Sequence, residues 1–130
     1  MKTSIAGAAL AAIMATSGVQ AGVSSDDFSV KTTGDLVKLC SAETTDPLYA
    51  AAIHFCHGFG VGVFETEQLH QTASRAAPLY CAPNPMPTRS QAVAGFVQWA
   101  AANPTVTNEV PAAGVLHYLI DTYPCPTKRR

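Results

Sequence analysis

The stretch "AIHFCHGFGVG", residues 52–62, combines two histidines and a cysteine with three glycines at every second position. Four interpretations of this stretch are considered: a metal site, a Cys/His nucleophile, a nucleotide-binding loop and an ordinary helix. Asp46-Pro47 precedes it and is a typical helix start. Asp accepts hydrogen bonds from free amides of the first turn, and Pro at the first position has no amide to satisfy. We therefore predict a helix from Pro47 to about Gln71 that contains the whole stretch.

The predicted helix carries an apolar face and three costly glycines. Its apolar residues recur at steps of three or four: Leu48, Ala52, Phe55, Phe59 and Val63. Each glycine destabilises a helix by about 1 kcal/mol relative to alanine, so some gain must offset it. We expect that another helix approaches closely on the side of Gly58 and Gly62.

The chemical interpretations of the stretch are weak. His54 and His57 could converge on one helical face, but Cys56 points elsewhere and no carboxylate completes the four ligands of structural zinc. A catalytic cysteine needs a base within hydrogen-bond reach, and Cys56 and His57 diverge by about 100° on a helix. "GFGVG" lacks the glycine spacing and the preceding strand of a nucleotide-binding loop. We predict no metal site, no cofactor and no enzymatic activity.

A short helix and a long loop flank the central helix. "TTGDLVKLC", residues 32–40, predicts a short helix with Thr33 as its cap. Residues 72–87 contain prolines at positions 83, 85 and 87, which indicates a rigid connecting loop.

Two further helices complete the chain. Thr88 and Gln91 form a capping box that begins a helix, and Asn103-Pro104 ends it. The last helix is expected from about residue 107 or 108 to 123, with Pro111 tolerated near its first turn. No segment shows the regular alternation of apolar and polar residues that is expected of a half-buried strand. We predict an all-α fold, a small domain of four to five helices.

The four cysteines predict two disulfides, because an even number in a small exported chain favours bridges over thiols. An antiparallel hairpin of 88–103 and 108–123 brings the end of the second helix beside the start of the first. That arrangement pairs Cys81 with Cys125 and leaves Cys40 to join Cys56.

The N-terminus predicts export. Residues 1–21 have a positive Lys2, an apolar run and small residues ending at Ala21, which is the pattern of a cleaved signal peptide. The apolar run is too short for a membrane anchor, so no membrane association is expected after cleavage. The remaining 22–130 form one domain of net charge −2, which disfavours nucleic-acid binding.

The cysteine framework resembles a known family. The segments that carry the likeness are "DLVKLC" (35–40), "C-x-G-F-x-x-G" (56–62), "YCAP" (80–83), "QAVAGFVQWAAANP" (91–104) and "YPC" (123–125). In this order they resemble the Tai/Rap family of periplasmic immunity proteins, which are often described as HdeA-like. The resemblance implies a periplasmic protein that binds and inhibits a type VI secretion amidase effector cleaving peptidoglycan peptides, commonly as a homodimer.

Two alternatives stay open at the level of sequence. An HdeA-like acid-stress chaperone would open when many carboxylates are protonated, but the chain has only nine acids. A structural or small-ligand-binding periplasmic protein could use the same fold, because fold does not determine function.

The loop 72–87 is the predicted partner-binding surface. We expect the core to take up Phe55, Phe59, Phe96, Leu119 and Ile120, which leaves recognition to other residues. The loop's prolines restrict its unbound conformations, and its side chains include types suited to interfaces. The candidate contact residues are Arg75, Tyr80, Asn84 and Met86.

Overall fold

The structure, a computed structural model, describes residues 22–126, so the predicted signal peptide lies outside the described residues. Within that part all regular secondary structure is helical, as predicted, with four α-helices, two 3-10 helices and no strand. The elements are η1 (Ser25–Ser29), α1 (Thr33–Cys40), α2 (Tyr49–Ser74), α3 (Arg89–Ala102), η2 (Pro104–Asn108) and α4 (Pro111–Thr122). None of the helices in 22–126 is long and apolar enough to cross a membrane.

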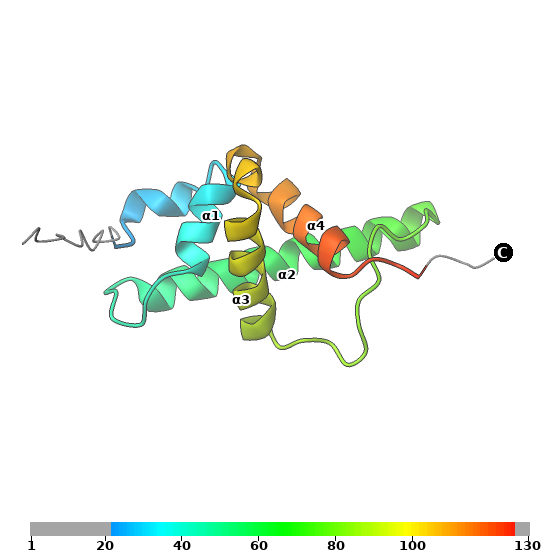
Figure 1. Ribbon diagram of the computed structural model, residues 1–130, viewed down its shortest axis with the longest axis horizontal. Helices are drawn as coiled ribbons and strands as arrows, with labels where there is room; N and C mark the ends of the chain where they lie inside the picture. The colour runs from blue at the N-terminus through cyan, green and yellow to red at the C-terminus, as the bar shows by residue number, and fades with distance from the viewer. Residues whose placement is uncertain (1–21, 127–130) are drawn as a thin grey trace, which may run out of the picture.

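Helix α2 is the longest element and the other three α-helices pack against it (Figure 1). Helices α1, α3 and α4 also contact one another. Their shared core contains Phe96 and Leu119, as predicted. Phe55 and Phe59 are only partly buried and pack against that core, with their rings stacked at 6.2 Å between centroids. Ile120 is also only partly buried, so its predicted place in the core is wrong.

The cap of α1 is Thr32, one residue before the predicted Thr33. The Thr32 hydroxyl accepts a hydrogen bond from Asp35 N at 3.2 Å, and the Asp35 carboxylate accepts one from Thr32 N at 2.9 Å. Thr33 is the first helical residue and is fully buried, with its Oγ1 donating to the carbonyl oxygen of Glu109 at 3.1 Å. Thr33 therefore does not cap α1 but connects it to Glu109, which is distant in the sequence.

Helix α2 is shifted along the chain from its predicted bounds. It begins at Tyr49 rather than Pro47 and ends at Ser74 rather than near Gln71. Asp46 still organises the start, because its Oδ1 accepts a hydrogen bond from Leu48 N at 2.7 Å. Its Oδ2 accepts one from Val23 N at 2.7 Å, which ties the N-terminal segment to the same residue.

The capping box at Thr88 and Gln91 and the end of α3 at Asn103 are confirmed. The last helix begins later than predicted. Pro104 opens the separate turn η2, and α4 starts only at Pro111. Pro111 is the first residue of α4 and lies in the first turn, where its missing amide leaves no helical hydrogen bond unmade.

Both predicted disulfides are present. Cys40–Cys56 joins α1 to α2, with the sulfur atoms 2.01 Å apart. Cys81–Cys125 joins the long loop to the segment after α4, with the sulfur atoms 2.04 Å apart. The first bridge belongs to the core and the second holds the base of the loop.

Candidate interaction site

The loop of residues 76–88 is held firmly where it leaves the helices. Cys81 is bridged to Cys125, and its backbone N donates a hydrogen bond to the Tyr123 carbonyl at 2.8 Å. Beyond this anchor the chain arches away from the helices before it enters α3 (Figure 1). Asn84 and Met86 are exposed on the arch, and 54% of Met86 is accessible to solvent. The loop thus combines a fixed base with an accessible tip.

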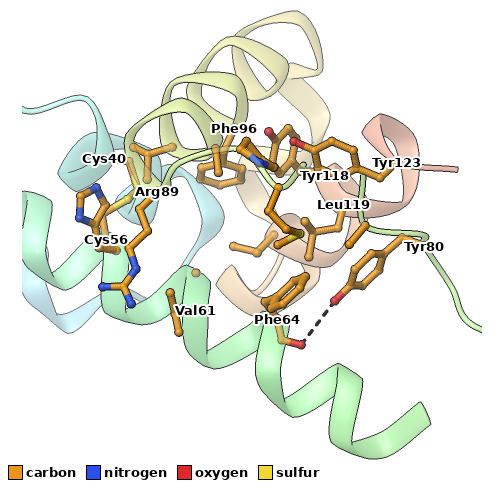
Figure 2. Close-up of a pocket in the computed structure, with 18 of the residues that line it drawn as sticks. Cys40, Cys56, Val61, Phe64, Tyr80, Arg89, Phe96, Tyr118, Leu119 and Tyr123 are labelled. Carbon is orange, nitrogen blue, oxygen red and sulfur yellow. Dashed lines mark hydrogen bonds between the residues drawn. A yellow bond between two sulfur atoms is a disulfide. The ribbon is translucent and has the colours of Figure 1, made fainter. Parts of the chain in front are cut away.

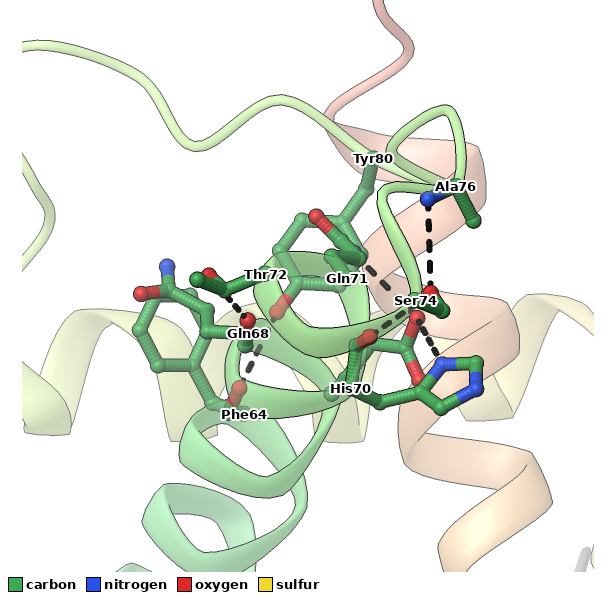
Figure 3. A network of polar contacts seen from close by, with 9 residues as sticks. Phe64, Gln68, His70, Gln71, Thr72, Ser74, Ala76 and Tyr80 are labelled. Carbon is green, nitrogen blue, oxygen red and sulfur yellow. Dashed lines mark hydrogen bonds and ion pairs between the residues drawn. The ribbon is translucent and has the colours of Figure 1, made fainter.

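Tyr80 belongs to the core and not to the exposed surface, so its prediction as a surface contact residue was wrong. Only 4% of Tyr80 is exposed, and its ring centroid lies 5.8 Å from that of Phe64. Its hydroxyl donates a hydrogen bond to the Phe64 carbonyl at 3.4 Å (Figure 3). Burial raises the pKa of Tyr80 above its ordinary value. Its place beside Cys81 was the sequence signal that it anchors the loop.

Arg75 lies at the other end of this loop region, directly after α2. It is exposed and adopts the left-handed conformation that ends the helix, with φ of 54°. The last turn before it is closed by side chains, as Ser74 Oγ donates to the His70 carbonyl at 2.7 Å (Figure 3). Arg75, Asn84 and Met86 are therefore accessible to a partner, and their role in binding stays a prediction.

A cavity of about 160 Å³ lies between α2, the loop and the core faces of α1, α3 and α4. Its lining is mostly apolar and includes Val61, Phe64, Phe96 and Leu119 (Figure 2). Met86 contributes from the loop. None of the described residues that line it is an aspartate or glutamate.

Two basic residues also line the cavity. Arg89, the first residue of α3, extends its side chain towards α2 and Val61 (Figure 2). Within residues 22–126 it forms no ion pair. His57 lines the same cavity from α2, and its Nε2 is buried without a hydrogen-bond partner among the described residues. The cavity lining therefore includes two basic side chains, and one nitrogen of His57 has no hydrogen-bond partner among the described residues.

The three alternating glycines of α2 open space on opposite sides of the helix. Gly60 lines the cavity, whereas Gly58 and Gly62 line a shallow groove beside Ala112 and Leu116 of α4. A Cβ atom added at any of the three would meet no atom of another segment of residues 22–126 within 4 Å. The predicted close approach of a helix at Gly58 and Gly62 is therefore wrong.

The fold places the cysteine and histidines of residues 52–62 where they offer neither a thiol nucleophile nor a metal site. Cys56 is committed to the disulfide with Cys40, so it offers no thiol nucleophile. His54 is exposed on α2. No group of three or more His, Cys, Asp or Glu side chains in 22–126 is arranged to hold a metal ion.

A family model described as "Rap1a immunity proteins" matches residues 32–125. The chain belongs to the Rap1a immunity protein family. The match runs from the cap of α1 to the last cysteine, and so includes all four α-helices and both disulfides. Membership indicates an immunity protein directed against a secreted effector. Neither a curated protein nor a solved structure matches the chain.

Proposed function

We propose that this Rap1a immunity protein acts in the periplasm, where it binds and inhibits a type VI secretion effector with peptidoglycan amidase activity. The family match over residues 32–125 carries the proposal. The signal-peptide pattern of residues 1–21 supports export, and two disulfides suit an oxidising compartment. Inhibition requires only that the protein covers the effector's catalytic cleft, so no catalytic group is needed on this chain.

The arch of residues 82–88 is the proposed contact with the effector. Its base is fixed by the Cys81–Cys125 bridge and by the buried Tyr80. A segment that is already restrained loses less conformational entropy on binding, which favours affinity. Met86 supplies an exposed apolar side chain and Asn84 an exposed amide. Arg75, at the other end of the loop region, is the proposed charged contact.

An inhibition assay tests the contact surface. The mature protein, residues 22–130, is titrated into a purified type VI secretion amidase effector from the same organism while the digestion of purified peptidoglycan is followed. We expect complete inhibition near equimolar protein. Met86→Asp or Arg75→Glu should inhibit about tenfold more weakly, which corresponds to a loss of about 1.4 kcal/mol of binding free energy.

Ala50→Asp is the matched control, because Ala50 is exposed at the start of α2 and away from the arch. This variant should inhibit as the wild type does. If wild-type protein in tenfold excess leaves the amidase active, the proposed effector class is wrong. If the wild type inhibits but both loop-region variants inhibit equally well, the contact lies elsewhere on the protein.

The HdeA-like description, the homodimer and the export route belong to the same proposal. The helical domain with two disulfides agrees with the first. Light scattering of mature protein should give twice the monomer mass, and a monomer at millimolar concentration would contradict the dimer. Fractionation of cells should place the protein in the periplasm with Gly22 as its first residue. A protein that retains residues 1–21 in the cytoplasm would contradict export.

A further inference from the structure

We propose that the cavity beside Gly60 is a binding site for a small monocarboxylate with an apolar body of about six to eight carbon atoms. The site adjoins the proposed effector contact, because Met86 of the arch also lines the cavity, but the proposal does not rest on the effector. It would make the protein a ligand-binding domain as well as an inhibitor.

The volume of the cavity suits such a ligand. An engineered apolar cavity of about 150 Å³ binds benzene. This cavity, which opens to solvent beside the exposed Met86 and Arg89, measures about 160 Å³. Val61, Phe64 and Leu119 form part of an apolar wall that offers water few hydrogen-bond partners (Figure 2). The hydroxyl of Tyr80, which also lines it, is already bonded to the Phe64 carbonyl. An apolar body would therefore be a better occupant than water.

Gly60 leaves part of the cavity open at a cost in helix stability. Glycine inside a helix is less stable than alanine by about 1 kcal/mol. Gly60 has no positive φ that would require glycine, and a Cβ there would touch no neighbouring atom within 4 Å. Neither backbone conformation nor helix packing therefore explains the residue. Any larger side chain at this position would project into the cavity and reduce it.

The basic side chains that line the cavity favour a ligand with an anionic head group. Arg89 brings a guanidinium to the cavity, and no carboxylate in residues 22–126 is paired with it. Guanidinium groups bind carboxylates through two parallel, charge-assisted hydrogen bonds. His57 adds a second basic side chain, whose Nε2 has no hydrogen-bond partner within residues 22–126. The head would thus lie at Arg89, with the apolar body directed towards Phe64 and Leu119.

Octanoate is the probe for this site, and 1-octanol is its uncharged counterpart. Both are titrated into isotopically labelled mature protein, and amide shifts are followed by nuclear magnetic resonance. Octanoate should shift residues of α2, α3 and the loop in a saturable way. Arg89→Gln should weaken octanoate binding about tenfold or more and octanol binding less than twofold, because it removes a charged hydrogen bond. An equal loss for both probes would overturn the assignment of the carboxylate to Arg89.

The glycines provide matched variants for the cavity itself. Gly60→Leu should fill the cavity and abolish octanoate binding, whereas Gly58→Leu, on the other side of α2, should leave binding unchanged. Gly60→Ala is the milder replacement should Gly60→Leu fail to fold, and it should weaken binding severalfold. The proposal is overturned if wild-type protein shows no saturable shifts up to 10 mM octanoate (about −3 kcal/mol), or if the Gly60 variants bind as wild type does.

Discussion

Gly114 of α4 lies so close to Thr33 of α1 that no side chain fits between the two helices. A Cβ atom on Gly114 would overlap the Oγ1 and Cγ2 atoms of Thr33. Thr33 cannot move away easily, because its Oγ1 donates to the carbonyl oxygens of Glu109 at 3.1 Å and Val110 at 3.2 Å. The close packing of α1 against α4 therefore depends on a glycine of α4, and not on the glycine-rich stretch of α2.

This contrast predicts opposite effects for glycine replacements. Gly114→Ala should lower the free energy of unfolding by about 1–3 kcal/mol, as overpacking of a core does. Gly58→Ala and Gly62→Ala should each raise it by up to about 1 kcal/mol, since nothing obstructs the new methyl group. Denaturant unfolding followed by the fluorescence of the single tryptophan, Trp99, measures all three. A neutral Gly114→Ala would show that the two helices can separate freely.

Tyr80 is predicted to stabilise the fold mainly through its ring. Tyr80→Ala should lower the free energy of unfolding by about 3–5 kcal/mol, as for other large buried aromatic residues. Tyr80→Phe should cost about 1 kcal/mol or less, because the hydrogen bond that it removes is long at 3.4 Å. Thermal melts of both variants check this. Equal losses would mean that the hydroxyl, rather than the packing, secures the loop.

Asp27 predicts a loss of stability in acid. Its Oδ2 accepts from Lys38 Nζ at 2.8 Å and from Ser24 N at 2.7 Å. The hydrogen bond from Lys38 and then those from Ser24 lower the pKa of Asp27 from 3.8 to about 2. Because the folded pKa is below the unfolded one, this stabilisation is complete above about pH 4 and is lost as the pH falls through about 2.

Melting temperatures of the wild type and Asp27→Asn between pH 2 and 6 measure the effect. The wild type should be the more stable protein near pH 6, and the difference should shrink as the pH approaches 2. A difference that stays constant over this range would show that the Asp27 carboxylate does not contribute through its charge.

The two disulfides should differ more in their effect on inhibition than on stability. Chain entropy predicts losses of roughly 3 kcal/mol for Cys40→Ala/Cys56→Ala and roughly 4 kcal/mol for Cys81→Ala/Cys125→Ala, from separations of 16 and 44 residues. Only the second pair releases the base of the loop. At a temperature where both variants remain folded, inhibition of the effector should fall further for the second pair. Equal inhibition would argue against the loop as the contact.

Several local features could be predicted from the sequence. The capping box of Thr88 and Gln91 and the stop at Asn103 depend on residues that are near neighbours in the chain. The disulfide pairing also followed, because two antiparallel helices with a short connection bring Cys81 and Cys125 together. The resemblance to the family likewise depends on the positions of cysteines and prolines, so it can be recognised from the sequence alone.

Only the tertiary structure decided which residues are buried and where space remains. Thr33 reads as a helix cap until Glu109, distant in the sequence, approaches its hydroxyl. Tyr80 reads as a loop side chain until Phe64 covers it. Gly60 cannot be told from Gly58 and Gly62 in the sequence, yet it faces a cavity whose walls come from every α-helix and the loop. Helix caps depend on local hydrogen bonds, whereas burial and empty volume depend on how distant segments meet.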